Sequence, residues 1–237
     1  MNDHVRDLAS VRDATERLLS AAATMDNASL AEPSRLPGWT RGHVLAHLAR
    51  NADALVNVFA GRPMYASAAA RDVDIDRDAP RELKVQLADV RDSAARFLAA
   101  TDATDATGSP ADWSRTVELR NGVTDSASRI PFRRLVEVEL HHVDLGIGYE
   151  LEDLPAEFTQ QEITFLAERF RGNAGVPAVL IRQDDGRAIR TGRHCAEDEE
   201  PVTVTGRQAD LLGWLAGRRD DSGLTATGGS LPTLPAL

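Results

Sequence analysis

The chain has 237 residues, enough to bury a substantial core in one large domain or two smaller ones, and we expect two. Acidic residues outnumber basic ones by 37 to 27, a formal charge of -10 that argues against a nucleic-acid partner. No apolar run is long enough to cross a membrane and the opening MNDHVRDLAS lacks a signal-peptide pattern, so we expect a soluble, cytoplasmic protein.

The first part of the chain is dominated by helical patterns. Four segments combine apolar residues at helical spacing with helix start or stop signals, and we expect helices there. They cover residues 3–25, the stretch from a cap at Thr40 to Gly61, the stretch from Pro80 to Leu98, and the stretch from Pro131 to Gly146. Between them, a loop is expected after Pro63 and a polar connection over residues 101–112.

The segment from Pro131 to Gly146 is assigned by its length. Val136, Val138 and Leu140 alternate as in a strand, but about fifteen residues between a proline and a glycine exceed a typical strand and match a helix.

The last part of the chain has a mixed pattern. Pro155 begins another helix that runs through Phe170. Two short strands are expected around the turn signal Asp185-Gly186, a third in PVTVTG, a helix in QADLLGWLAGR, and an extended tail in TGGSLPTLPAL. The predicted fold is therefore mainly α, with a helical domain over residues 1–154 and a small α+β domain over residues 155–237.

The chain has a single cysteine, Cys195, which excludes an intrachain disulfide and a cysteine-rich zinc site. This cysteine follows His194 and precedes an acidic run, so we place it in a polar loop with no sign of thiolate stabilisation. Any metal would have to be held by histidine, aspartate and glutamate side chains.

The histidines are concentrated on the two segments with the strongest apolar stripes. Glu137 and His141 lie four residues apart, which places both side chains on one face of a helix, within reach of a common ion. His43 and His47 are also four apart, so either is a candidate third ligand. We favour His47 because it lies deeper in the apolar run. Two histidines and one carboxylate would leave a coordination position open, as a catalytic metal site requires.

The same residues have an ordinary alternative. In it, His47 is a core histidine with a satisfied hydrogen bond, while Glu137 and His141 form a solvent-facing pair on their helix. In either case we expect His142 to face the adjacent side of the helix. Asp144 is expected either to accept a hydrogen bond from a ligand or to cap the helix end.

Two stretches resemble the mycothiol-dependent maleylpyruvate isomerase family of the DinB-like superfamily: LPGWTRGHVLAHLARNADAL and, further along, EVELHHVDLG. The resemblance implies an N-terminal DinB-like four-helix bundle followed by a small α+β C-terminal domain. It also implies a zinc-binding histidine from the second helix and a Glu-x-x-x-His pair from a later helix. These positions match His47, Glu137 and His141, which leaves His43 as a neighbour of the site.

Two weaker matches, MYASAAARDVDI and WLAGR, extend the resemblance over nearly the whole chain. They contain Arg71 and Arg218, which the resemblance suggests as contacts for an anionic substrate. A guanidinium can bind a carboxylate through two hydrogen bonds, but the 27 basic residues include many other candidates. The alternative for each of these two arginines is an ordinary surface position.

The resemblance implies a metal-dependent enzyme that activates mycothiol as a zinc-bound thiolate, since a dication stabilises the thiolate near neutral pH. The reaction that it implies first is cis-trans isomerisation of maleylpyruvate, an anionic electrophile, to fumarylpyruvate. The alternative at the same site is a mycothiol S-transferase that conjugates or exchanges thiols on electrophilic substrates. Zinc is favoured, although nickel, iron and manganese bind similar ligands.

Two further alternatives belong to other classes of protein. A non-enzymatic module would hold a metal or small ligand through the same three residues, and a fourth protein ligand would distinguish it. A metal-dependent hydrolase would need a general base near the open position, for which Asp53 and Asp144 are candidates that spacing does not single out. We expect a monomer or a small homo-oligomer.

Overall fold

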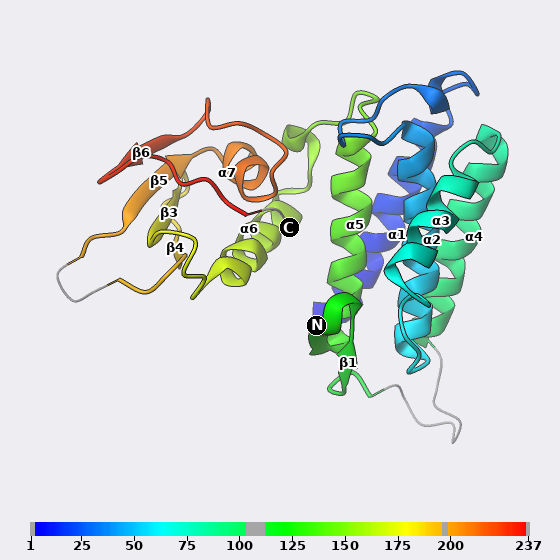
Figure 1. Cartoon of the computed structure of the whole chain (residues 1–237), viewed down its shortest axis with the longest axis horizontal. Coiled ribbons are helices and arrows are strands. Elements are labelled where there is room, and N and C mark those ends of the chain that lie inside the picture. The colour runs from blue at the N-terminus through cyan, green and yellow to red at the C-terminus, as the bar shows by residue number, and fades with distance from the viewer. Residues whose placement is uncertain (1–2, 103–111, 196–198, 236–237) are drawn as a thin grey trace. The chain divides into compact units, whose positions relative to one another are not determined.

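A computed structural model of the protein describes residues 3–102, 112–195 and 199–235. The chain divides into two compact units, Met1–Tyr149 and Glu150–Leu237. The first unit is a helical bundle and the second a small α+β unit (Figure 1), so the fold class predicted from the sequence is confirmed. Within the described ranges, no helix has both the length and the apolar character needed to cross a membrane.

Four long helices surround the core of the first unit (Figure 1): α1 (Asp3–Ala22), α2 (Arg41–Phe59), α4 (Leu83–Asp102) and α5 (Ile130–Asp144). Helix α2 packs on α4 and α5, and α1 packs on the same two helices. The fully buried side chains between them include Leu18, Leu45, Leu48, Phe97 and Leu135. Each such side chain contributes about 1.5–3 kcal/mol through removal from water, so this core fixes the relative positions of α2 and α5.

The two helices that carry the candidate ligands begin with clear local signals. Thr40 caps α2: its hydroxyl accepts a hydrogen bond from the His43 backbone N–H, while the His43 ring accepts one from the Thr40 backbone N–H. Pro131 stands in the first turn of α5, where its missing N–H costs no helical hydrogen bond. Beyond the end of α5, Gly146 adopts a positive φ of 64°, a conformation that glycine adopts without strain.

The prediction of a loop after Pro63 is wrong in part, because this segment contains the helix α3 (Ala68–Asp78). Ser67 caps this helix through a 3.0 Å hydrogen bond from the Ala70 backbone N–H. Only Ile75 among its apolar side chains is buried, so α3 has no apolar stripe that the sequence could reveal. Helix α3 packs on α2.

Short elements complete the first unit. They are the 3-10 turns η1 (Ser29–Ala31), η2 (Arg120–Gly122) and η3 (Ala127–Arg129), and the antiparallel strands β1 (Thr116–Glu118) and β2 (Thr124–Ser126). The connection expected over residues 101–112 lies outside the described residues except at its ends, where α4 continues through Asp102.

The second unit packs two helices, α6 (Ala156–Phe170) and α7 (Gln208–Leu215), with a four-stranded sheet of order β4-β3-β5-β6. Its elements also include η4 (Leu151–Asp153), β3 (Val179–Gln183), β4 (Ala188–Thr191), β5 (Val202–Gly206) and β6 (Thr225–Thr227). Strands β3 and β5 run parallel, with buried Ile181 opposite buried Val204. Past β6, residues 228–235 form no helix or strand, but the Trp214 indole N–H donates to the Pro232 carbonyl at 3.2 Å.

Candidate metal centre

Helices α2 and α5 bring together the three side chains that the sequence singled out as metal ligands. One potential ligand atom from each of His47, Glu137 and His141 lies within 4.8 Å of the other two. Glu137 is central, because its Oε2 lies 2.9 Å from His47 Nε2 and 3.3 Å from His141 Nε2. Two imidazole nitrogens and a carboxylate oxygen converging from two rigid helices suit a divalent transition metal.

Asp144 sets the orientation of His141. Its Oδ2 lies 2.7 Å from His141 Nδ1, so the ring donates Nδ1–H to this buried carboxylate. The other ring nitrogen, Nε2, then faces Glu137 within the cluster formed by His47, Glu137 and His141. Metal-ligating histidines commonly have such a carboxylate on their other nitrogen. Of the two roles expected for Asp144, this contact corresponds to the hydrogen-bond acceptor behind a ligand.

The charges of the three side chains follow from their surroundings. Burial lowers the pKa of His47 to about 4, although its hydrogen bond to Glu137 opposes this shift. Burial would raise the pKa of Glu137, but hydrogen bonds from His141 and His47 hold it well below its ordinary value. Burial also disfavours charged His141, yet hydrogen bonds to Asp144 and Glu137 raise its pKa. At and below pH 6.5, the metal-free cluster thus pairs an ionised Glu137 with a protonated His141.

Zinc binding to this cluster is expected to strengthen as pH rises, because zinc and a proton compete for His141. With its pKa raised above 6.5, His141 is protonated in the metal-free protein at and below that pH, and ligation requires its Nε2 lone pair. Each zinc ion should therefore release about one proton, until the pH exceeds the raised pKa and the affinity levels off. Zinc titration against a competing chelator at several pH values measures this slope.

The Asp144→Asn variant tests the cause of this pH dependence. The hydrogen bond from His141 to the Asp144 carboxylate raises the His141 pKa, and an amide at position 144 is neutral. The His141 pKa should therefore fall, and the zinc affinity should level off at a lower pH. On that plateau zinc should bind about 10–100-fold more weakly, since the ring loses its orienting carboxylate. A zinc affinity that does not change with pH in the wild-type protein would contradict a ligand role for His141.

Arg71, the arginine suggested for anion binding, lies beside the cluster. Its Nη2 is 3.2 Å from His47 Nδ1, and its Nη1 donates to Asp72 at 2.7 Å. The guanidinium carbon lies 5.7 Å from the Trp39 ring centre and 6.0 Å from that of Tyr65, both within cation-π range. The two aromatic rings therefore hold a cation next to the candidate metal position.

Arg218, the other arginine suggested for anion binding, belongs to the second unit. It follows α7, and its Nη1 donates to the Ala216 carbonyl at 3.0 Å. Its contact with a substrate stays a prediction.

A cavity of about 450 Å³ adjoins this arrangement through Tyr65. It lies between the α2–α3 connection and the segment that includes β1 and η2, and its lining includes Arg62, Arg115 and Arg120 beside Glu118. Three guanidinium groups against one carboxylate favour anionic groups in this space.

A fully buried cation, Arg134, was not identified from the sequence. It lies on α5 one turn before Glu137, and its Nη1 donates to the Leu48 carbonyl at 3.0 Å and to Asn51 Oδ1 at 2.8 Å. Burial lowers its pKa to about 10, while the negative charge of Glu137 opposes this shift. A signal was present, since Arg134 interrupts the apolar stripe of α5, but an arginine at such a position can equally face solvent.

Other candidate residues lie in different settings. His43 lies in the first turn of α2, where its ring accepts a hydrogen bond from the Thr40 backbone N–H, and it is no part of the cluster. Its Nε2 lies 3.6 Å from the exposed Asp76. Asp53 pairs with Arg96 at 2.7 Å. Cys195 is half-buried, and its sulfur lies 4.0 Å from Arg190 Nη1.

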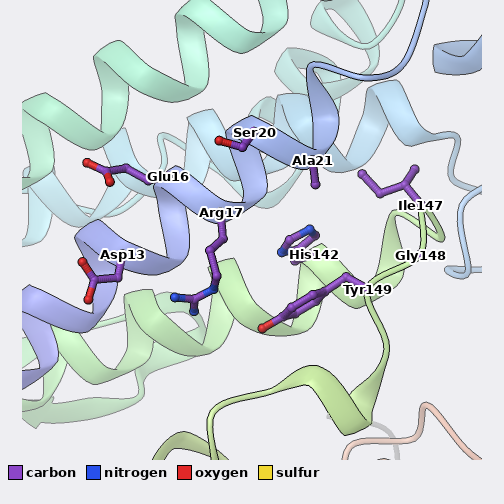
Figure 2. A pocket seen from close by; sticks show the side chains of 9 residues that line it. All are labelled: Asp13, Glu16, Arg17, Ser20, Ala21, His142, Ile147, Gly148 and Tyr149. Carbon is purple, nitrogen blue, oxygen red and sulfur yellow. The ribbon is translucent and has the colours of Figure 1, made fainter.

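His142 faces a different environment from its neighbour His141. It lines a pocket of about 620 Å³ between α1 and α5 (Figure 2) and stacks on Tyr149, with ring centres 3.9 Å apart. In the same region the Tyr149 hydroxyl and the Arg17 guanidinium both donate to the buried Glu139 carboxylate. His142 thus belongs to the α1-facing side of α5 and does not join the cluster.

The fold and the cluster together define the class of protein: a helical bundle with a candidate His-Glu-His metal site, joined to a small α+β unit. Residues 11–146 match the family model described as the mycothiol maleylpyruvate isomerase N-terminal domain, and residues 153–236 match the MDMPI C-terminal domain. The chain belongs to the mycothiol maleylpyruvate isomerase family, as the two sequence stretches indicated.

Solved structures agree with this assignment. The crystal structure of a mycothiol-dependent maleylpyruvate isomerase is similar to this chain, with a TM-score of 0.85 and 28% identity over 99% of this chain and 97% of that chain. A second crystal structure, of such an isomerase with one histidine replaced by alanine, gives a TM-score of 0.84 with the same identity and coverage. Among curated proteins, no sequence matches the chain.

Proposed function

We propose that this chain is a metal-dependent enzyme that uses mycothiol to convert maleylpyruvate to fumarylpyruvate. The observation that carries the proposal is the convergence of His47, Glu137 and His141 in a chain whose two parts both match this isomerase family. Among the residues that the structure describes, no fourth histidine, cysteine or carboxylate joins this group. A site with three protein ligands and an open position is typical of catalytic metals, which argues against a closed regulatory site.

In this proposal the chain's own side chains hold and orient the reactants. His47, Glu137 and His141 provide the metal ligands, and Asp144 keeps the His141 ring turned toward the cluster. A dication bound there would supply the positive charge that favours the thiolate form of mycothiol near neutral pH. Arg71 lies close enough to His47 to orient an anionic substrate beside the same position, and the cavity lined by Tyr65 offers room for the rest of a ligand.

The reaction needs no net change in the thiol. The thiolate sulfur adds to one carbon of the cis double bond, and the electron pair moves to the neighbouring carbonyl as an enolate. Rotation about the resulting single bond follows, and the enolate then expels the thiolate to give the trans isomer. Arg71 and the buried charge of Arg134 place positive potential near the cluster, where it stabilises an anionic enolate.

Purified protein loaded with zinc provides the direct test. With mycothiol present, it should convert maleylpyruvate to fumarylpyruvate, followed by the ultraviolet spectra of the two acids and by product analysis. The thiol should be recovered unchanged. If mycothiol is instead consumed and appears attached to the substrate, the site is that of an S-transferase. Inactivity of zinc-loaded protein with both mycothiol and maleylpyruvate would contradict the proposal.

A further inference from the structure

The contact between Arg71 and His47 fixes the position of a proton. Arg71 Nη2 lies 3.2 Å from His47 Nδ1. An arginine side chain has only hydrogen-bond donors, so His47 Nδ1 must accept through its lone pair. A neutral imidazole carries one N–H, which here must be on Nε2, where it can donate to Glu137 Oε2 at 2.9 Å.

Metal binding requires the opposite arrangement in His47. Its Nε2 is the nitrogen that faces Glu137, the central residue of the cluster, and it can bind a metal only through a lone pair. The ring proton must then be on Nδ1, which would point an N–H at the N–H groups of Arg71. Two donors cannot share that 3.2 Å contact, so the guanidinium has to leave His47.

His141 shows no such conflict. Its Nδ1–H already donates to Asp144, which leaves Nε2 directed at the cluster. The two histidines therefore differ: the Nδ1–H of His141 already points away from the cluster to Asp144, whereas Arg71 holds the Nδ1 of His47 as an acceptor.

We propose that Arg71 is an anion-binding residue released by the metal: metal binding turns its guanidinium away from His47 and frees it to bind a carboxylate group of the substrate. The identity of that carboxylate rests on the proposed function. The release itself depends only on the hydrogen bonds of His47.

The surroundings of Arg71 allow this movement. Trp39 and Tyr65 lie 5.7 and 6.0 Å from the guanidinium carbon, so their rings can keep attracting the cation while its N–H groups turn. Only 13% of the Arg71 side chain is exposed, and its partner Asp72 is 60% exposed. An ion pair with so exposed a partner is weak, and a bidentate substrate carboxylate can replace it.

Binding order follows from this arrangement. In the metal-free protein Arg71 is engaged by His47, so an anion binds weakly; once the metal is in place, the freed guanidinium binds the anion more tightly. Since coupling between two ligands is reciprocal, an anion bound to Arg71 should in turn strengthen metal binding. The protein would thereby disfavour substrate binding to a site that lacks its metal.

Nitrogen-15 NMR of the histidine rings in the full-length protein tests the proposal, with His47 signals assigned by their loss in His47→Gln. In metal-free wild-type protein the His47 proton is expected on Nε2, and zinc should move it to Nδ1.

In Arg71→Met, zinc should bind about tenfold more tightly, because no hydrogen bond to a charged group has to be broken. Arg12→Met, at an exposed arginine on α1, is the matched control and should change neither property.

Anion binding provides the second measurement, with succinate as a dicarboxylate that has no double bond for a thiol to attack. Succinate should bind more tightly to zinc-loaded than to metal-free wild-type protein, and Arg71→Met should remove most of this gain. Loss of a nearby positive charge would by itself favour zinc, so the ring proton is decisive. The proposal is overturned if metal-free His47 already carries its proton on Nδ1, or if the succinate gain persists in Arg71→Met. Neither measurement uses turnover, so an inactive enzyme would overturn only the proposed function.

Discussion

The Glu137→Gln variant is expected to lose zinc binding and, with it, isomerase activity, while keeping the fold. Glu137 is the only negatively charged group of the cluster and lies between both histidines, at 2.9 Å from His47 and 3.3 Å from His141. Glutamine has nearly the same shape but offers a neutral, weaker oxygen ligand. Loss of a residue that supports a metal ligand weakens metal binding by about 10–100-fold. Loss of a ligand itself should cost at least the upper end of this range, so we expect zinc affinity to fall by at least about a hundredfold and turnover to fall to background.

Controls separate ligand loss from misfolding. Zinc per chain is measured by elemental analysis after dialysis, beside the unfolding temperature of each protein. Glu16→Gln makes the same chemical change at an exposed position on α1 and should retain zinc, activity and stability. A folded Glu137→Gln protein that still binds one zinc per chain with wild-type affinity would show that Glu137 is not a ligand.

The candidate ligands could be found in the sequence because helical spacing is a local property. Glu137 and His141 share a face of any helix that contains both, whatever that helix packs against. The pairing of this face with His47 across two helices is not local, since it depends on how the core side chains of α2 and α5 pack. Spacing left His43 and His47 equal, and the choice came from depth in the apolar run together with the family resemblance.

The surroundings of the cluster were harder to predict. Arg71 was suggested only by resemblance, and its contact with His47 could not be foreseen while α3 was taken for a loop. Trp39 was not among the candidate site residues, yet its ring centre lies 5.4 Å from that of His47. Side chains that act through tertiary contacts carry no fixed spacing in the chain, so a pattern search does not reveal them.

The charge balance around the cluster supports an anionic ligand. Arg71 and the buried Arg134 are two cationic groups beside the carboxylates Glu137 and Asp144, and at and below pH 6.5 protonated His141 is a third. A dication that replaces the proton on His141 adds one further positive charge to this group. A metal at this position would therefore attract both a thiolate and an anionic substrate, which is consistent with addition of a thiolate to a dicarboxylate.

The Gly42→Ala variant is expected to destabilise the first unit, although alanine favours helices by about 1 kcal/mol over glycine. Gly42 lies in the first turn of α2, where an added Cβ would stand 2.2 Å from the backbone oxygen of Ala79, just after α3. Gln86 fixes this contact by donating both to the Ala79 carbonyl at 2.8 Å and to the Gly42 carbonyl at 3.2 Å. A backbone oxygen cannot turn aside as a side chain does, so α2 and the end of α3 must separate.

This separation should be visible in both stability and the site. We expect the free energy of unfolding, from urea titration, to fall by about 2–3 kcal/mol, the upper part of the usual cost of overpacking, because the added Cβ meets backbone atoms. Because α3 carries Arg71 and α2 carries His47, the shift should also weaken the contact between them and bring zinc affinity closer to that of Arg71→Met. Gly61→Ala, with a φ of 68° but no atom within 4 Å of the added Cβ, should cost only the left-handed backbone strain of about 1–2 kcal/mol and leave zinc affinity unchanged. Wild-type stability in Gly42→Ala would mean that α2 and α3 approach less closely than the structure places them.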